Sequence, residues 1–180
     1  MGGAAPLPTL VALTAYLLYV VAHRLSELRV SARNQRALTA RGGHEVGRGH
    51  FALFVILHTL YPIGLATEVL TRGTRPGPLW PLWLALLVAA QALRTAAQAA
   101  LGERWTVRVW VVPGLAPVTG GIYRWIRHPN YVAVTIELVA GPLLFGARRT
   151  AFVASAINLA ALLIRIPIEE RALRDAAARR

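Results

Sequence analysis

Two short polar segments interrupt the long apolar runs in the C-terminal half of this sequence. The first covers residues 121–131 and has the sequence GIYRWIRHPNY, and the second covers residues 165–170 and has the sequence RIPIEE. Together they offer carboxylates, guanidinium groups, phenols, an imidazole and an amide, which can bind a polar small molecule and orient a reacting oxygen. We expect both segments, with the apolar hairpin between them, to form one site at the water-facing end of a membrane bundle.

Ionisable side chains inside the apolar runs are a second source of chemistry. Each costs about 2.5–3.5 kcal/mol at the centre of a membrane helix, so such groups usually face the interior of the bundle. His58 and Glu137 are the two candidates for a general base. Each also has a structural interpretation: a neutral His58 bonded to a neighbouring helix, and Glu137 paired with Arg94 or Arg165. The sequence leaves both interpretations open.

Arg165 and Glu169 are four residues apart, so a helix would present them on one face. Pro167 lies between them and weakens the helix, which frees backbone groups for other partners. Pro129 marks the start of the preceding helix, because proline is favoured in a first turn. Taken alone, these residues also fit an ordinary ion pair and a turn, so only their combination indicates a site.

Membrane helices must position these residues. The chain is 56% hydrophobic and 16% charged, with a mean hydropathy of +0.48, whereas a soluble domain has about 45–50% apolar and about 25% charged residues. A helix crosses a bilayer in about 20 residues. We therefore predict an all-α integral membrane protein with five transmembrane helices, the last two forming a short hairpin. The five apolar runs are Leu7–Ala22, Phe51–Leu70, Leu79–Leu101, Tyr131–Ala147 and Thr150–Ile168.

The distribution of arginine predicts the orientation of the bundle. Arginines gather after the first run, after the third run and in the C-terminal tail, which by the positive-inside rule puts the N-terminus outside and the C-terminus in the cytoplasm. Residues 24–50 are predicted to form an amphipathic element against lipid headgroups, broken at Gly42 and Gly43. Since the first run lacks a basic n-region and a cleavage site, we expect a retained span.

Composition also excludes some classes of function. The net charge of +12 could indicate nucleic-acid binding, but the arginines lie between apolar runs, so we expect no nucleic acid. The chain has no cysteine, which excludes thiolate ligands and a cysteine nucleophile, and we expect no metal. All basic residues are arginine, with no lysine, which favours a GC-rich bacterial genome and a plasma-membrane protein. Nothing in the sequence indicates an oligomeric state.

Together, the two polar segments resemble the isoprenylcysteine carboxyl methyltransferase family and its small bacterial relatives. The resemblance is specific over about residues 101–173 and weaker upstream. It rests on an ordered set of residues with matching spacing: Gly121, Tyr123, Arg127, His128, Pro129, Asn130, Tyr131, Pro142, Arg165, Glu169 and Glu170.

The family consists of membrane-embedded methyltransferases, so the resemblance implies S-adenosylmethionine as cofactor. It further implies that residues 1–180 form one domain, with three helices and the Arg-rich cytoplasmic loop in residues 1–100 and the cofactor region in residues 101–180. Arg165 would face the acceptor and orient its oxygen. The implied cofactor-binding residues are Leu115, Val118, Tyr123, His128, Pro129, Asn130, Tyr131, Glu169 and Glu170.

The sequence departs from the family pattern at two positions. Leu115 stands where the eukaryotic enzymes carry histidine, and Ala133 stands where the motif usually continues to glycine. Glu137 is not part of the prenylcysteine motif, which indicates a different acceptor. A carboxylate acceptor is already ionised and needs mainly Arg165, whereas a phenol with a pKa of about 10 needs a base such as Glu137 or His58.

We therefore expect O-methylation of a lipophilic acceptor from the bilayer, a long-chain phenolic or pyrone lipid hydroxyl. The catalytic candidates are Arg165, Glu137 and His58. Carboxyl methylation of an isoprenylcysteine and N-methylation of a phospholipid amine are alternatives, although Arg165 argues against an amine. A proton-handling subunit and a helical scaffold are the alternatives without methyl transfer, and they predict no cofactor affinity.

Overall fold

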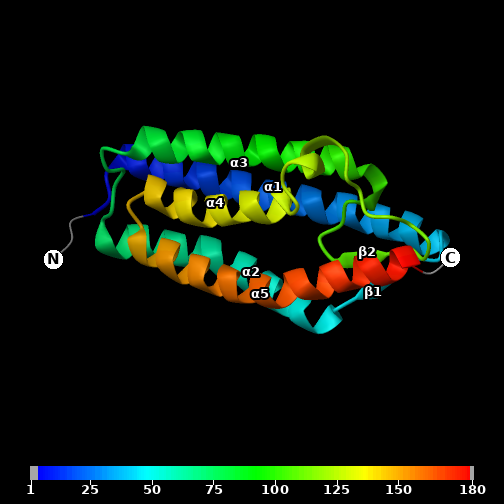
Figure 1. The fold of residues 1–180 in the computed structure, drawn as a ribbon. Coiled ribbons are helices and arrows are strands. Elements are labelled where there is room, and N and C mark those ends of the chain that lie inside the picture. The colour runs from blue at the N-terminus through cyan, green and yellow to red at the C-terminus, as the bar shows by residue number, and fades with distance from the viewer. Residues whose placement is uncertain (1–3, 179–180) are drawn as a thin grey trace.

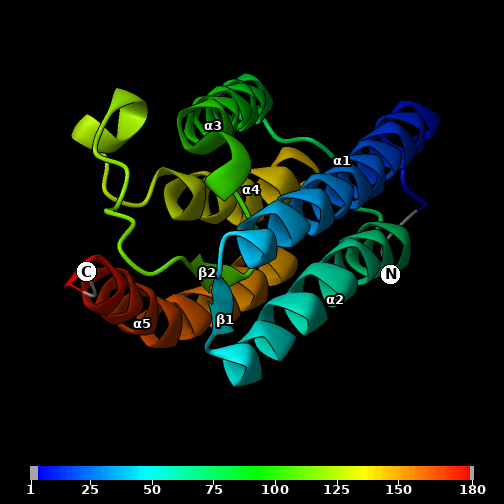
Figure 2. The same ribbon diagram turned by 90° about the vertical axis from the view of Figure 1, so that its right-hand side faces the viewer.

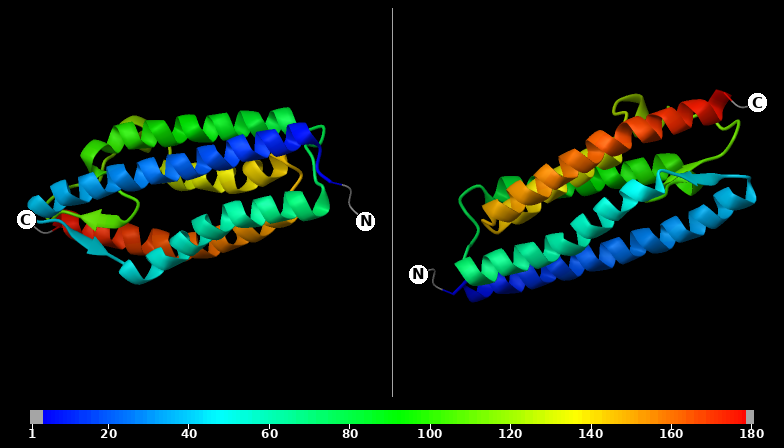
Figure 3. Two further views of the ribbon diagram at one scale, coloured as in Figure 1. Left: turned by 180° about the vertical axis from the view of Figure 1, so that it is seen from behind. Right: turned by 90° about the horizontal axis from the view of Figure 1, so that it is seen from below.

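A computed structural model describes residues 4–178 of the chain as a bundle of long helices that run up and down (Figure 1). In Figures 1 and 3, α2 and α5 lie on one side of the bundle, and α1, α3 and α4 lie on the other. α4 packs against both α3 and α5, and α5 packs against α2. The helices are α1 (Leu7–Ala40), α2 (Arg48–Arg72), α3 (Trp80–Leu101), α4 (Pro129–Leu144) and α5 (Arg148–Ala178).

Four of these helices, all except α4, are long and apolar enough to cross a membrane. α4 has 16 residues, or about 24 Å at 1.5 Å per residue, which is less than the roughly 30 Å of a hydrocarbon core. Each predicted apolar run overlaps one helix, and the all-helical membrane character is confirmed. The hairpin of the last two helices is not short as predicted, because α5 has 31 residues and continues ten residues past Ile168. The count of five spans stays a prediction.

The first helix is longer than the sequence predicted. The apolar run ends at Ala22, yet α1 continues to Ala40 and has 34 residues. Its second half contains Leu, Ala, Arg and Gln, which are good helix formers, and neither Gly nor Pro interrupts it. The helix ends just before Gly42 and Gly43, where the break was predicted. The N-terminal span and the Arg-rich segment therefore form one continuous rod.

A two-stranded sheet, which the sequence did not predict, lies at the C-terminal end of the bundle (Figure 2). β1 (His44–Val46) pairs antiparallel with β2 (Val109–Val111), with Glu45 opposite Trp110. Nη1 of Arg108 lies 2.9 Å from Oε1 of Glu45, which braces the pair. The sheet fixes the irregular segment after α3, which also contains two short 3₁₀ helices, η1 (Gly102–Arg104) and η2 (Gly121–Arg124).

The turn between α4 and α5 is held by two contacts with α2 and its following loop. Gly146 has a φ of +72°, and a Cβ built on it would lie 2.6 Å from the carbonyl oxygen of Arg75. The carboxylate of Glu68 accepts hydrogen bonds from the backbone N–H groups of Arg149 (3.1 Å) and Thr150 (2.7 Å). Glu68 thus caps the N-terminus of α5, where negative charge is stabilising.

The apolar core contains a close helix crossing. The hydroxyls of Tyr16 on α1 and Tyr61 on α2 form a 2.8 Å hydrogen bond, and both lie against Gly141 of α4, where a Cβ would overlap them. Leu65 and Phe145 are buried beside them. Three helices meet at a point where only glycine leaves enough room.

Candidate active site

A cavity of about 1200 Å³ lies between α1, α2, α4, α5 and the segment after α3. It is lined by all the residues that the sequence predicted for the site except Glu137. These are His58, Leu115, Val118, Tyr123, His128, Pro129, Asn130, Tyr131, Arg165, Glu169 and Glu170. Residues that lie more than 100 positions apart in the sequence therefore surround one space.

At its polar end, the start of α4 meets the second half of α5. Nε of Arg165 donates a hydrogen bond to the phenol oxygen of Tyr131 at 2.7 Å, and the Tyr131 hydroxyl donates to Oε2 of Glu169. Nη2 of Arg165 donates to the carbonyl oxygen of Val107 at 2.9 Å. The Arg165 guanidinium also lies over the Phe54 ring, 4.9 Å from its centroid. Arg165 is thus fixed by groups from three other segments.

A second pair lies beside this group. The ring of His128 stacks on that of Tyr131, with centroids 5.4 Å apart and an interplanar angle of 17°. Nε2 of His128 lies 3.1 Å from Oε1 of Glu170. Since α4 begins at Pro129, His128 is its N-cap residue, and the two adjacent glutamates of α5 take different partners at this helix start.

Tyr123 approaches the site from η2. Its burial, and then the nearby carboxylate of Glu169, raise the pKa of Tyr123 to about 12. The phenol therefore stays neutral at physiological pH and can donate a hydrogen bond.

The segment that carries Leu115 and Val118 is tied down at two points. Nη1 of Arg104 donates to the carbonyl oxygen of Ala116 at 2.8 Å, and the backbone N–H of Gly114 donates to the carbonyl oxygen of Ala176 at 2.8 Å. These bonds hold the segment over the cavity, between η1 and the end of α5.

Several buried polar atoms around the cavity have no hydrogen-bond partner among the described residues. At the polar end they are Nε1 of Trp110 and Oδ1 of Asn130, and deeper in the bundle they are Nε2 of His58 and Oδ1 of Asn158. Buried polar groups are nearly always hydrogen-bonded, to protein, water or a ligand, so these atoms are available to a molecule bound in the cavity. Neither Trp110 nor Asn158 is among the predicted site residues. Asn158 is a lone asparagine in an apolar run, which is a sequence signal for a buried polar site.

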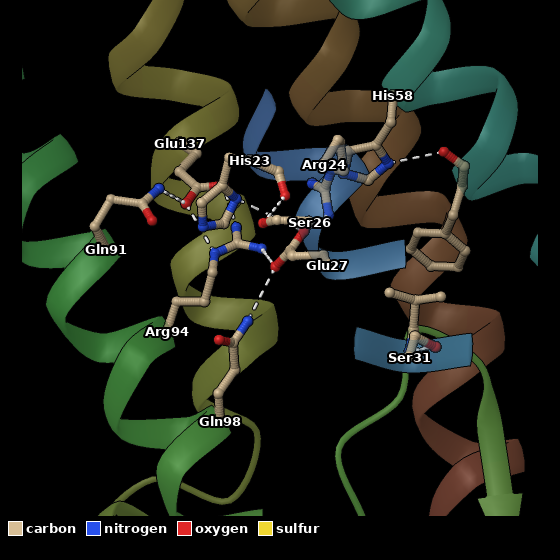
Figure 4. A network of polar contacts seen from close by, with 12 residues as sticks. His23, Arg24, Ser26, Glu27, Ser31, His58, Gln91, Arg94, Gln98 and Glu137 are labelled. Atoms are coloured by element: carbon tan, nitrogen blue, oxygen red, sulfur yellow. Dashed lines mark hydrogen bonds and ion pairs between the residues drawn. The ribbon is translucent and has the colours of Figure 1, made fainter. Parts of the chain in front are cut away.

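Glu137 lies outside this cavity. Its carboxylate accepts hydrogen bonds from Nε2 of Gln91 (2.6 Å), Nε of Arg94 (3.2 Å) and Nη2 of Arg94, and it lines a separate cavity of about 310 Å³. Figure 4 shows that Arg94 joins it to Glu27 of α1, with Nη1 of Arg94 2.6 Å from Oε1 of Glu27. Glu137 was interpreted either as a general base or as the partner of Arg94 or Arg165. In the structure it pairs with Arg94, and it does not line the cavity that contains Arg165.

His58 has a defined orientation in α2. Its Nδ1 lies 2.7 Å from the carbonyl oxygen of Phe54, one turn earlier. A carbonyl can only accept, so Nδ1 carries the proton and Nε2 of the neutral ring carries a lone pair. Within residues 4–178, no group of three or more His, Cys, Asp or Glu side chains could hold a metal ion.

Comparison with known proteins gives a consistent family. Residues 83–175 match the model of the isoprenylcysteine carboxyl methyltransferase (ICMT) family. The chain is 32% identical to the uncharacterized protein YpbQ of Bacillus subtilis, over 87% of this chain and 93% of that protein. It is 30% identical to an uncharacterized protein of Haemophilus influenzae, over 86% and 90% of the two chains. No solved structure matches.

Proposed function

Because the chain belongs to the isoprenylcysteine carboxyl methyltransferase family, and so to a class of membrane methyltransferases, we propose that it transfers a methyl group from S-adenosylmethionine to a hydroxyl of a membrane lipid. A long-chain phenol or pyrone is the proposed acceptor. The observation that carries this proposal is that the large cavity has both a polar end and an apolar opening. Val21, Leu25 and Val55 line that cavity and are also exposed on the outside of the bundle.

The residues at the polar end fit the cofactor. S-adenosylmethionine has a sulfonium, an ammonium group and ribose hydroxyls, which suit the carboxylates of Glu169 and Glu170. The unpartnered oxygen of Asn130 can accept a hydrogen bond, and Nε1 of Trp110 can donate one. The proposed cofactor-binding residues remain Leu115, Val118, Tyr123, His128, Pro129, Asn130, Tyr131, Glu169 and Glu170.

When bound, the cofactor would supply a methyl group: the C–O bond forms as the C–S bond breaks, and that electron pair stays on sulfur. The protein must align the acceptor oxygen and remove its proton. We assign the removal to Nε2 of His58, the lone pair of which has no protein partner. Arg165 lines the same cavity as His58 and Glu169 and holds Tyr131 in place. We assign Glu137 a structural role.

We further propose five transmembrane helices, with the N-terminus outside and the C-terminus in the cytoplasm of a bacterial cell. The second half of α5, which carries Arg165, Glu169 and Glu170 at the polar end of the cavity, runs to the C-terminal end of the bundle (Figure 1). Most of the arginines lie in the second half of α1, in the segment after α3 and in the tail. In this orientation the water-soluble cofactor enters from the cytoplasm, and the acceptor enters from the bilayer.

The direct test uses membranes that contain the protein and S-adenosylmethionine labelled in its methyl group. Label is expected in extractable lipid for the wild type, and a Glu169→Ala variant should need more cofactor to reach the same rate. An Arg165→Ala variant should lose mainly turnover of the acceptor. Label in protein would instead support a prenylcysteine acceptor. Failure of the purified wild type to bind S-adenosylhomocysteine would refute the proposed function.

A further inference from the structure

Two polar side chains, those of Arg24 and His58, lie between the large cavity and the small one. Among the described residues, only Val20, Arg24 and His58 line both cavities. Arg24 comes from α1 and His58 from α2, and Figure 4 includes both beside the buried ion pairs. The sequence analysis had placed Arg24 at the start of an Arg-rich cytoplasmic segment. In the structure it belongs to the interior of the bundle.

Among the described residues, the guanidinium of Arg24 forms a hydrogen bond with Glu27 alone. Its Nη1 lies 2.6 Å from Oε2 of Glu27, and the Glu27 carboxylate is fixed in turn by Nη1 of Arg94 at 2.6 Å and Nε2 of Gln98 at 3.2 Å. The Arg94 side chain is 2% exposed, whereas that of Arg24 is 27% exposed. The buried ion pairs thus hold Arg24 in place while its guanidinium still faces a cavity.

The side chain of Arg165 is more enclosed than that of Arg24. It is only 7% exposed, and it donates to the Tyr131 hydroxyl and the Val107 carbonyl. An arginine has five N–H donors, and in Arg24 only Nη1 has a partner within residues 4–178. The other donors of Arg24 are therefore available to a molecule in the cavity.

His58 complements Arg24 chemically. Its Nδ1 is bonded to the Phe54 carbonyl, so its buried Nε2 is a pure acceptor, and it has no partner among residues 4–178. Phe54 lies one turn away on α2 and stacks under Arg165. His58 therefore lies about one helical turn, roughly 5 Å, along α2 from the Phe54 ring beside Arg165, and Arg24 lines the same two cavities as His58.

We propose that Arg24 and His58 together bind the hydroxyl of the acceptor. The guanidinium of Arg24 donates to the hydroxyl oxygen, and the hydroxyl proton is donated to Nε2 of His58. A hydroxyl satisfies both groups, because it accepts and donates at once. A carboxylate would satisfy Arg24 but would face the lone pair of His58 without a proton, and an ammonium group would be repelled by Arg24. This inference rests on the proposed function and adds a residue that selects the class of acceptor.

Binding of lipid probes to the purified full-length protein tests this pair. The probes are a pentadecyl-substituted phenol, pentadecylbenzene, which lacks the hydroxyl, and hexadecanoate, which carries a carboxylate. We expect the wild type to bind the phenol about 10–100-fold more tightly than pentadecylbenzene, as for hydrogen bonds with charged groups, and more tightly than hexadecanoate. Arg24→Gln and His58→Phe should each remove most of this preference without changing the affinity for pentadecylbenzene.

The matched control is Arg29→Gln, which removes an exposed arginine of the same helix that lines neither cavity. It should keep the preference of the wild type. All variants should bind S-adenosylhomocysteine as the wild type does, so loss of that binding in the wild type refutes the proposed function instead. Retention of the phenol preference in both Arg24→Gln and His58→Phe, or equal binding of hexadecanoate and the phenol by the wild type, overturns the inference. If Arg24→Gln does not fold, the His58→Phe result decides.

Discussion

The guanidinium of Arg165 and the phenol of Tyr131 are joined by a 2.7 Å hydrogen bond, which links α5 to the first turn of α4. The same phenol donates to Glu169, so one hydroxyl fixes both a cation and a carboxylate. The position of the Glu169 carboxylate therefore depends on a residue 38 positions earlier in the chain.

We expect Tyr131→Phe to weaken cofactor binding by about 10–100-fold, because it removes two hydrogen bonds to charged groups, each worth about 1.5–3 kcal/mol, and compensation by water recovers part of this. Titration calorimetry with S-adenosylhomocysteine measures the change. Tyr19→Phe is the control, since the hydroxyl of Tyr19 has no partner in the described part of the chain and Tyr19 is 46% exposed. Equal affinities of the wild type and Tyr131→Phe would contradict the site.

The ion pairs of Arg94 predict unequal effects of two substitutions. Arg94→Met leaves the half-buried carboxylate of Glu137 without a cation and leaves the buried Glu27 with Arg24 alone, which should cost about 3–5 kcal/mol. Glu137→Gln removes one charge but keeps an oxygen that can accept from Arg94, so it should cost less. Unfolding in detergent compares the two variants.

The same Glu137→Gln variant separates a structural role from catalysis. It should keep methyl transfer at a rate close to that of the wild type, because Glu137 lies outside the large cavity. A 100-fold or greater loss of turnover in a well-folded variant, as expected for a missing general base, would restore Glu137 as a catalytic candidate.

Gly141→Ala should destabilise the bundle by about 1–3 kcal/mol, because the added methyl overlaps the hydroxyls of Tyr16 and Tyr61. The cost should fall when the same change is made in a Tyr16→Phe/Tyr61→Phe background, which removes those hydroxyls. Thermal unfolding of the four proteins completes the double-mutant cycle. An unchanged cost in the double-phenylalanine background would mean that the strain arises elsewhere.

Glu68→Ala should cost about 1–2 kcal/mol, since the backbone N–H groups of Arg149 and Thr150 lose their cap. Glu103→Ala is the matched control, because Glu103 is exposed and caps no helix. Thermal unfolding should separate the two variants by several degrees. Equal unfolding temperatures of the two variants would contradict the capping role of Glu68.

The sequence was sufficient for much of the fold because the apolar runs are long and continuous enough to predict membrane helices. The ends of α3 and the start of α4 fall within two residues of the prediction, since Pro81 and Pro129 mark first turns and Gly102 follows the last turn of α3. The residues of the cofactor region also meet in one cavity, as expected from their spacing.

Contacts between distant segments were not predictable in this way. β1 and β2 have three residues each and pair across 65 positions, so neither has a local pattern that distinguishes it from a loop. Glu27 was assigned to the cytoplasmic segment, yet it bonds Arg94, 67 positions away. In the sequence, a charge at the end of an apolar run fits a membrane interface as well as it fits the interior of a bundle. Glu27 is buried because α1 continues past the apolar run.

The shortness of α4 has a consequence for the membrane around it. Irregular backbone is tolerated at hydrocarbon depth only where protein covers it or where it lines a cavity, and the segment before Pro129 lines the large cavity. In the proposed orientation, both substrates then meet within the inner leaflet. A lipid made in, or delivered to, the outer leaflet would have to flip before it could be methylated, so the modified lipid should first accumulate on one side of the membrane.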